Sequence, residues 1–282
     1  MSTHGHSISN PDLTRLRTLI YSQAGINMGP DKKTMLELRI RHRMRSLEID
    51  SFADYCEFLF SRRGQSEELI HFLDAVTTNK TDFFREPNHF AFLTKSALPM
   101  LDSDCGHLRP LLVWCAGCST GEEAYTLAMV LSEYAHAHSG FRFKILATDI
   151  CTRVLDKANR AIYQTDDLSP VPAELRRKYF VRSRDRGSNL VRVVPELRDL
   201  IEFRRLNFME NDYAIGPQAD VIFCRNVIIY FDRTTQEQVL RKLVHHLAPG
   251  GHLFLGHSET LHGLDVSLAP VAPALYRKPS HG

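Results

Sequence analysis

The chain has 282 residues, enough for one large domain or two smaller ones, and its formal net charge at pH 7 is only +2. Hydrophobic residues make up 43% of it and charged residues 24%, as in an ordinary globular protein. No apolar run reaches the roughly 18 residues that a membrane span needs, and the N-terminus MSTHGHSISNPDL lacks the apolar core of a signal peptide, so we expect a cytoplasmic protein without direct membrane insertion.

The first 76 residues are predicted to be helical. Met1–Asn10 is rich in Ser and His, has little to bury and is expected to be frayed. Apolar residues at helical spacing then predict four helices. The first is capped by Asn10 or Asp12 and ends at Gly25. The others span three ranges: Asp31–Leu47, Phe52–Arg62 and Glu67–Val76.

The helix over Asp31–Leu47 combines one buried stripe with a strongly basic remainder. The stripe consists of Leu36, Ile40, Met44 and Leu47. Four arginines are expected on the exposed arc: Arg39, Arg41, Arg43 and Arg45. An ordinary solvated face is one interpretation. Because the charge is concentrated and nearly one-signed, we favour a docking surface for an acidic partner.

Residues 77–85, TTNKTDFFR, are polar and stand before Pro87, which predicts a loop or linker. A plain connector is one interpretation. Alternatively, Asn79, Thr81 and Arg85 are polar groups that could face a ligand bound further along the chain. A helix is expected next, from about Asn88 to Leu101.

The stretch Leu111–Tyr125, LLVWCAGCSTGEEAY, organises the rest of the chain. Its apolar start predicts a strand buried on both faces of a parallel sheet. Gly117 and Gly121 then predict a tight turn before a helix, the unit that brings a nucleotide-like ligand against bare backbone. Glu122 and Glu123 would repel a phosphate at the helix start, so an uncharged or cationic ligand is favoured.

Six cysteines lie scattered along the chain, several of them in apolar runs. This usage indicates buried free thiols of a reducing compartment and not a disulfide framework. Cys115 and Cys118 form a C-x-x-C that could be a redox or zinc pair. Since no second C-x-x-C supplies partner ligands, we favour small residues lining a turn and expect no metal.

A second buried strand, Phe143–Thr148, runs directly into Asp149. A carboxylate at this position usually accepts hydrogen bonds from both ribose hydroxyls of a bound nucleoside. Alternatively, Asp149 only caps the next predicted helix, Thr152–Ala161. We favour the ribose role, because the glycine turn and the acid occur together.

Residues Asp166–Asp199 interrupt the α/β rhythm and predict a small antiparallel insertion. It would contain a helix over Leu175–Phe180 and a strand over residues 190–194. Alternation then resumes with strands over Ile201–Leu206 and Val221–Cys224. A helix from Thr235 to Leu247, a turn at residues 249–251 and strands near His252–Leu255 and Leu275–Lys278 complete a mostly parallel sheet with an antiparallel edge.

Four segments in this order, TTNKTDFFRE, AGCSTGEEAY, ATDI and FCRNVIIYF, resemble the chemotaxis receptor methyltransferases of the CheR family. The resemblance covers about Leu13 to Lys278, and FFRE combined with CSTGEE and FCRNVIIYF is highly specific. Two departures are visible: Cys115 stands where the family is expected to have Ser, and Ala124 where Pro is common.

The resemblance implies a class I S-adenosylmethionine-dependent methyltransferase fold, with a Rossmann-like doubly wound sheet. Residues 1–76 would form an all-helical domain for substrate docking, and residues 77–88 a linker contributing to the cofactor site. Residues 89–282 would form the methyltransferase domain, with an inserted β-subdomain at about residues 166–199. The cofactor would be S-adenosylmethionine, giving S-adenosylhomocysteine, without a metal.

The resemblance also implies roles for individual residues. Arg225 would lie near the methionine end of the cofactor, and Tyr230 beside the transferred methyl; both are predicted to be catalytic. An aromatic core residue is the alternative role for Tyr230. The predicted cofactor-binding residues are Asn79, Thr81, Arg85, Gly117, Gly121, Glu122, Asp149, Asn207, Phe208, Arg225 and Asn226.

The implied reaction is methylation of glutamate side chains on bacterial chemoreceptors, which gives the methyl esters used in chemotaxis adaptation. The four arginines would meet the acidic methylation helices of the receptors, and a receptor C-terminal tail peptide is a further candidate partner at the β-subdomain. One alternative is an RNA methyltransferase, but no aromatic residues interleave with the basic cluster, so no nucleic acid is expected. A catalytically idle receptor-binding module is the other.

Overall fold

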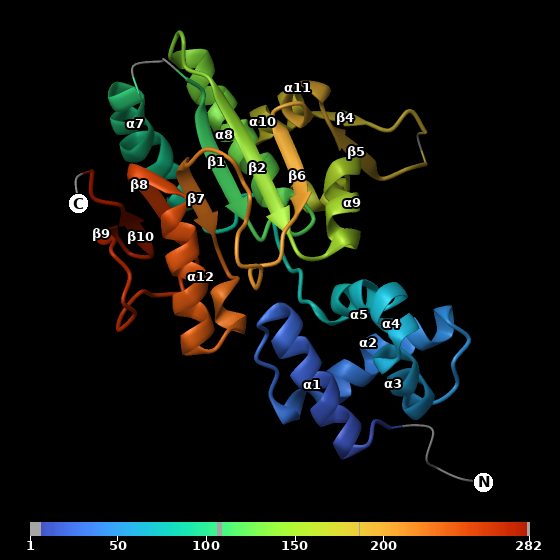
Figure 1. The fold of residues 1–282 in the computed structure, drawn as a ribbon. Helices are drawn as coiled ribbons and strands as arrows, with labels where there is room; N and C mark the ends of the chain where they lie inside the picture. Colours follow the sequence, from blue (N-terminus) through green and yellow to red (C-terminus); the bar gives the residue numbers. More distant parts are fainter. Residues whose placement is uncertain (1–6, 106–108, 186, 281–282) are drawn as a thin grey trace.

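The computed structural model describes residues 7–105, 109–185 and 187–280, in a helical N-terminal domain and an α/β domain (Figure 1). The helical domain consists of α1 (Asn10–Ala24), the 3-10 turn η2 (Pro30–Lys32), α2 (Lys33–Ser46), α3 (Phe52–Phe60), α4 (Arg62–Glu67) and α5 (Leu69–Val76). Its apolar side chains share one core, in which Leu16, Ile40, Tyr55 and Phe72 are fully buried. In the described part of the chain, no helix is both long and apolar enough to cross a bilayer.

The ends of these helices correct several expectations. Ser9, and neither Asn10 nor Asp12, caps α1 by accepting a hydrogen bond from the Asp12 amide. Of the stretch expected to be frayed, residues 1–6 lie outside the described residues, but Ile8 is buried and its amide donates to Glu37. Ser61 adopts an extended backbone that ends α3 and caps α4, so a new helix begins before the predicted one.

The α/β domain is built on a seven-stranded sheet with the order β6-β2-β1-β7-β8-β10-β9. The strands β1 (Leu111–Ala116), β2 (Phe143–Asp149), β6 (Ile201–Arg205), β7 (Ala219–Cys224) and β8 (Leu247–Leu255) are parallel. The edge strands β9 (Ala269–Ala272) and β10 (Leu275–Arg277) are antiparallel. This arrangement confirms the doubly wound, mostly parallel sheet with an antiparallel edge.

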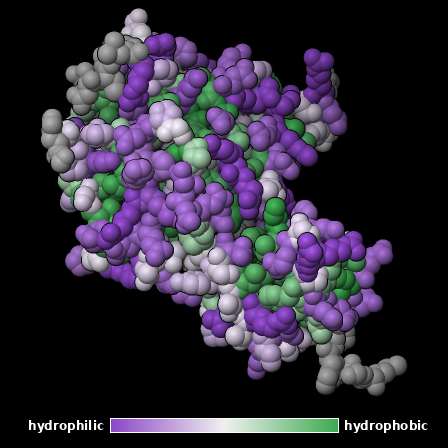
Figure 2. All heavy atoms as spheres, viewed as in Figure 1, coloured by the Kyte–Doolittle hydropathy of each residue, from purple (hydrophilic) through white to green (hydrophobic). Residues whose placement is uncertain are grey.

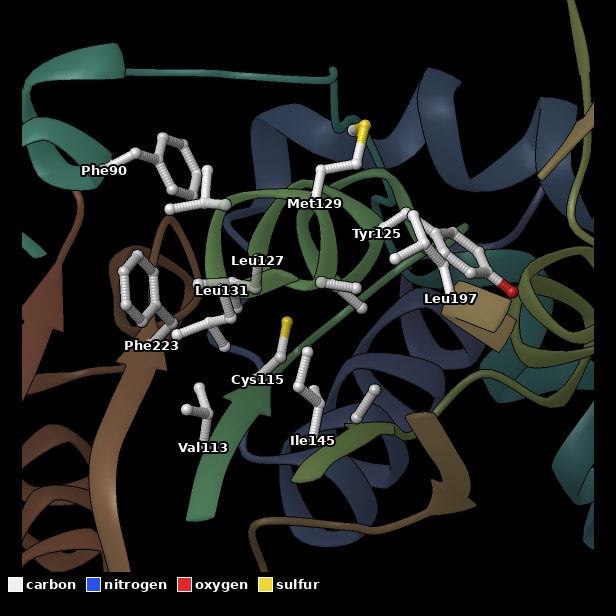
Figure 3. Packing of buried hydrophobic residues seen from close by; sticks show 14 of the residues in the cluster. Phe90, Val113, Cys115, Tyr125, Leu127, Met129, Leu131, Ile145, Leu197 and Phe223 are labelled. Carbon is white, nitrogen blue, oxygen red and sulfur yellow. The ribbon is translucent and has the colours of Figure 1, made fainter. Parts of the chain in front are cut away.

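Helices cover both faces of this sheet. Val113 and Cys115 of β1 point toward Leu127 and Leu131 of α8 (Glu122–Ala137) (Figure 3), while Trp114 belongs to the opposite core beneath α12 (Arg233–His245). The other helices are α6 (Pro87–Phe92), the π-helical η3 (Leu93–Ala97), α7 (Leu98–Cys105) and α9 (Thr152–Arg160). The single helix expected over Asn88–Leu101 is thus divided by a π-helical turn.

A second, three-stranded antiparallel sheet with the order β3-β5-β4 projects from the main one. It consists of β3 (Ile162–Gln164), β4 (Phe180–Arg182) and β5 (Leu190–Val193), together with η4 (Thr165–Leu168), α10 (Ala173–Tyr179) and α11 (Pro195–Arg198). The antiparallel insertion is confirmed, but it begins at Ile162, ahead of the predicted start at Asp166. The strand β3 was missed because it is so short and only Tyr163 in it is buried.

The segment Pro249-Gly250-Gly251 lies inside β8 and is not the predicted turn. It coincides with a register shift in the β7–β8 pairing, where a Cβ on Gly251 would approach the Asp220 carbonyl oxygen to 2.8 Å. Glycine therefore permits a close approach of two strands at this point.

The strand order reverses between β1 and β7, because β1 lies between β2 and β7. Ligands of open α/β sheets bind at such a switch point, beyond the carboxyl ends of the strands. Figure 1 shows that β1 and β2 point with these ends toward the helical domain. In Figure 2, hydrophobic side chains gather where the two domains adjoin. The fold thus places the crevice expected at this switch point between the two domains.

Candidate functional site

A cavity of about 410 Å³ lies between the helical domain and the carboxyl ends of the parallel strands. Ligand sites typically have volumes of about 300–1,000 Å³. The helical domain and linker contribute Ala24, residues 26–29, Lys32, Met35, residues 76–81 and Arg85. The α/β domain contributes Gly117, Ser119, Glu123, Asp149, Ile150, Asn207, Phe208, residues 225–227 and residues 229–231.

The turn after β1 forms the floor of this cavity. The amides of Gly117 and Cys118 donate to the Thr148 carbonyl oxygen at 2.7 and 2.9 Å, which holds the turn against β2. Gly117 has a φ of +87°, and a Cβ there would approach Val227 to 2.5 Å. Ser119 donates from its hydroxyl to the Asn79 carbonyl oxygen at 2.8 Å. The turn is therefore fastened to the linker that closes the cavity.

The two acids at the start of α8 face different surroundings, and only one of them lines the cavity. Glu122 accepts from the Thr120 hydroxyl at 2.6 Å, lies 3.8 Å from the Lys157 ammonium and does not line the cavity. Gly121 does not line it either, because it packs against Ala158 and Tyr163. Glu123 lines the cavity instead. The sequence could not separate two adjacent acids that point about 100° apart on a helix.

Asp149 lies at the cavity wall with 9% of its surface exposed. One carboxylate oxygen accepts from the Ser119 amide at 2.8 Å and the other from the Cys151 amide at 2.9 Å. Burial raises the pKa of Asp149, and these backbone hydrogen bonds oppose that rise. Each oxygen can accept a further hydrogen bond. The carboxylate thus holds two loops and still faces the cavity. It does not cap α9, whose first amides donate to Asp74, so the capping alternative is wrong and the ribose role stays a prediction.

Arg225 is the centre of a buried charge cluster at the other side of the cavity. Its side chain is 1% exposed and donates to Glu123 at 2.9 Å, to Glu86 at 3.0 Å and to the Arg85 carbonyl oxygen at 2.5 Å. Burial works against ionisation of Glu86, but the hydrogen bond from Arg225 lowers its pKa overall. For Glu123, burial dominates and raises the pKa despite Arg225. These contacts give Arg225 a structural task; its catalytic role stays a prediction.

The loop after β7 is held by an acid that sequence analysis missed. Glu259 is 5% exposed and accepts from the amides of Asn226 and Val227, both at 2.8 Å, and of Gly256 at 2.6 Å. Asn226 has a φ of +59° in this loop. The carboxylate thereby sets the backbone that carries Tyr230 into the cavity. No local pattern predicts this contact, because Glu259 lies in a loop distant in sequence.

Most predicted cofactor-binding residues are brought together. Asn79, Thr81, Arg85, Gly117, Asp149, Asn207, Phe208, Arg225, Asn226 and Tyr230 all line the one cavity. Sequence analysis missed its other wall, where Ile26, Met28 and Met35 of the helical domain face the α/β domain.

The thiols of Cys115 and Cys118 are buried and free, and burial raises the pKa of both. Cys115 donates to Glu123 at 3.2 Å.

The basic helix α2 is not the open arc that its sequence suggested. Arg39 donates to the Val76 carbonyl oxygen and, at 3.0 Å, to that of Thr77. Arg43 forms a two-pronged ion pair, at 2.9 and 2.7 Å, with Glu68, whose side chain is 2% exposed. The expectation that both lie on the exposed arc is therefore wrong, because α5 and the residues at its two ends supply partners for this face. Arg41 is half-buried over the Phe52 ring, and Arg45 is exposed.

One cluster among the described residues has the composition of a metal site. The ligand atoms of Glu86, His89 and His257 lie within 4.8 Å of one another. Both ring nitrogens of His89 lack a hydrogen-bond partner, and burial lowers its pKa to about 4. However, Arg225 already occupies the Glu86 carboxylate at 3.0 Å, and its positive charge would repel a dication. The geometry is therefore poorly suited to a metal ion.

Models of known protein families match this chain over most of its length. The family model described as the CheR methyltransferase SAM binding domain matches residues 79–272, and that of the CheR methyltransferase all-alpha domain matches residues 11–77. A chemotaxis protein methyltransferase of Borreliella burgdorferi is 37% identical over 96% of this chain and 95% of its own length.

Two further relatives carry the same name. The chemotaxis protein methyltransferase of Salmonella typhimurium is 40% identical over 92% of this chain and 86% of its own length. That of Escherichia coli is 39% identical over 92% of this chain and 87% of its own length. The chain therefore belongs to the CheR family of S-adenosylmethionine-dependent methyltransferases that act in chemotaxis.

Proposed function

We propose that this protein transfers the methyl group of S-adenosylmethionine to glutamate side-chain carboxylates of chemoreceptors, and that it works in the cytoplasm without a metal. The observation that carries the proposal is a cavity that both domains line. Side chains of the α/β domain that are predicted to bind the cofactor line it opposite a wall formed by the helical domain, which supports the proposal. The acceptor and the cofactor can therefore meet in one cavity.

The cavity residues suit the cofactor chemically. Asp149 lines the cavity with carboxylate oxygens that can accept from ribose hydroxyls, and the side-chain amides of Asn79, Asn207 and Asn226 line it with donors and acceptors. Glu123 adds a negative group toward the part of the ligand that carries positive charge. Phe208 supplies an aromatic face for the adenine. When bound there, S-adenosylmethionine supplies an electrophilic methyl group on a positively charged sulfur.

The chain's task is then mainly alignment. A glutamate carboxylate has an ordinary pKa of about 4.3 and is ionised at neutral pH, so no general base has to remove a proton. Accordingly, the described residues that line the cavity include no histidine. We assign Tyr230 the orientation of the acceptor carboxylate through its hydroxyl, with Arg225 fixing the linker beside it. Holding the reacting groups in line supplies most of the acceleration in such a reaction.

The helical domain is proposed to dock the acidic methylation helices of the receptors. After the correction above, Arg45 and the partly exposed Arg41 remain as candidate contacts on α2, and Lys32 stands at the cavity. Such charges add specificity and encounter rate more than affinity. A receptor tail peptide could add a strand to β4, which forms an edge of the small sheet.

The chemistry is tested by incubating the protein with methyl-labelled S-adenosylmethionine and receptor-containing membranes, followed by mild base. A glutamate methyl ester releases labelled methanol, whereas an N-methyl group is stable to base. We expect label in the receptor band, nearly all of it base-labile. Label that enters RNA, or that stays on protein after base treatment, would overturn the proposal.

A further inference from the structure

Helix α9 begins without a cap of its own. Cys151 occupies the N-cap position, and its side chain makes no capping hydrogen bond. The first amides of a helix have no partner within the helix and need an acceptor from elsewhere. Asp74 of α5 provides it from the other domain. One of its carboxylate oxygens accepts from the Thr152 amide at 2.9 Å, and the other from the Arg153 amide at 3.2 Å.

Asp74 is buried and makes further hydrogen bonds to the start of α9. It is 6% exposed, and the Thr152 hydroxyl donates to the same carboxylate at 2.5 Å. Its main-chain carbonyl oxygen also accepts from the Arg153 guanidinium at 3.5 Å. A buried negative charge is favourable here, because the N-terminus of α9 carries the positive end of the helix dipole. The helical domain thus fixes the start of a helix in the α/β domain.

The residues just before α9 carry the carboxylate that faces the cavity. Asp149 accepts from the Cys151 amide at 2.9 Å, so a short turn joins it directly to the capped end of the helix. Asp149 and Ile150 both line the cavity. The two carboxylates are also close enough to interact: burial raises the pKa of Asp149, and the negative charge of Asp74 raises it further. A substitution at Asp74 would therefore affect Asp149 through Thr152, whose amide donates to Asp74, and through the adjacent Cys151, whose amide donates to Asp149.

We propose that Asp74 is a positioning residue of the cofactor site. By capping α9 across the domain boundary, it fixes the turn over residues 149–151 and with it the orientation of the Asp149 carboxylate toward the ribose. This inference rests on the proposed function, in which Asp149 binds the ribose hydroxyls. It gives the helical domain a part in cofactor recognition in addition to docking the acceptor.

The test is the selectivity for the ribose hydroxyls, measured on the full chain by calorimetry. The readout is the ratio of the Kd of 2′,3′-dideoxy-S-adenosylhomocysteine to the Kd of S-adenosylhomocysteine. In the unaltered protein this ratio should be on the order of 10- to 100-fold, because the carboxylate makes charge-assisted hydrogen bonds. A residue that only stabilises the fold would leave the ratio unchanged even if both affinities fell.

Asp74→Ala should lower the ratio by about threefold or more, the scale of a lost helix cap. Asp74→Asn keeps one capping oxygen, so it should retain most of the Kd ratio of the unaltered protein. Thr152→Val removes only the hydroxyl contact and should lower the ratio in the same direction, which keeps the test decisive if Asp74→Ala fails to fold. Asp232→Ala is the matched control: Asp232 also caps a helix, α12, and also touches the helical domain, through Tyr21. It should leave the ratio unchanged.

Asp149→Ala distinguishes a failure of the positioning role of Asp74 from a failure of the ribose assignment of Asp149. If Asp149→Ala reduces the ratio to near one while Asp74→Ala and Thr152→Val leave it at the unaltered value, the positioning role is overturned and the proposed function stands. If Asp149→Ala itself leaves the ratio unchanged, the ribose assignment fails, and the inference about Asp74 fails with it.

Discussion

The main chain of Tyr230 contacts the helical domain, whereas its side chain lines the cavity. Its carbonyl oxygen accepts from the Asn27 amide at 2.8 Å and so joins the loop after β7 to the helical domain. Its side chain lines the cavity. A hydroxyl contact to the acceptor carboxylate would orient its attacking oxygen toward the methyl group, whereas the ring would pack equally well without the hydroxyl.

Tyr230→Phe should therefore lower kcat by roughly tenfold or more, the scale of one hydrogen bond to a charged group. The Kd of S-adenosylhomocysteine should change little, because that contact is not made to the cofactor. Steady-state methylation kinetics and calorimetry check the two quantities. A normal kcat together with a lowered Tm would instead assign the ring to packing.

Single residues also show where sequence reasoning reached its limit at the site. Asp149 and Gly117 line the cavity, and their place beside a ligand could be predicted because a strand followed by a glycine turn or an acid is a local pattern. Glu123 was passed over for Glu122, since a choice between neighbours on a helix depends on how the helix is rotated against the sheet. Glu259 and Asp74 act across long sequence separations, and no pattern around either residue signals its partner.

At the scale of elements, α2 shows how tertiary partners change the meaning of a charge pattern. Arg43 pairs with the buried Glu68, which also accepts from the Tyr55 hydroxyl at 3.0 Å, whereas Arg45 is exposed. Replacing one partner of a buried pair leaves an uncompensated charge, at a cost of about 3–5 kcal/mol. Exposed substitutions usually change stability by about 0.5 kcal/mol or less.

Arg43→Glu should therefore unfold at much lower urea concentration than the unaltered protein, while Arg45→Glu should unfold at nearly the same one. If the docking proposal is right, Arg45→Glu should also raise the KM for receptors and weaken its dependence on salt. Equal urea midpoints for the two variants would contradict the ion pair. An unaltered KM for Arg45→Glu at low salt would remove α2 from receptor recognition.

The predicted elements were most accurate where periodicity and burial agree. The strands β1 and β2 and the helix α8 follow from long apolar patterns. The boundary errors concern short or interrupted elements: β3 has one buried residue, and Ser61 ends α3 and caps the short α4, which was not predicted between the two expected helices. These features depend on the backbone of neighbouring segments, which the local sequence does not specify.

For the whole molecule, buried histidines should make the fold sensitive to acid. His252 is 2% exposed, and burial followed by the charge of Arg277 lowers its pKa to about 4. In the unfolded chain a histidine titrates near 6.5, so between the two values the unfolded state binds more protons. Stability from this group is present above pH 6.5 and is lost as the pH falls toward 4. Raised carboxyl pKa values, such as that of Glu123, act in the opposite direction.

Comparison with His252→Phe isolates this contribution. The unfolding free energy of the unaltered protein, relative to that of the variant, should fall by up to about 1.4 kcal/mol per pH unit below pH 6.5. Urea unfolding at pH 7.5, 6.5 and 5.5 measures it. A difference between the two proteins that is the same at all three pH values would show that His252 does not titrate abnormally in the fold.

The central claim is that the cavity shared by both domains holds the cofactor, with the ribose on Asp149. Calorimetric titration of the full-length Asp149→Ala variant tests it most directly. S-adenosylmethionine and S-adenosylhomocysteine have the same ribose, so both should bind more weakly by about the same amount, roughly 1.5–3 kcal/mol. Unchanged affinity for both ligands in a folded variant would contradict the claim and place the cofactor elsewhere.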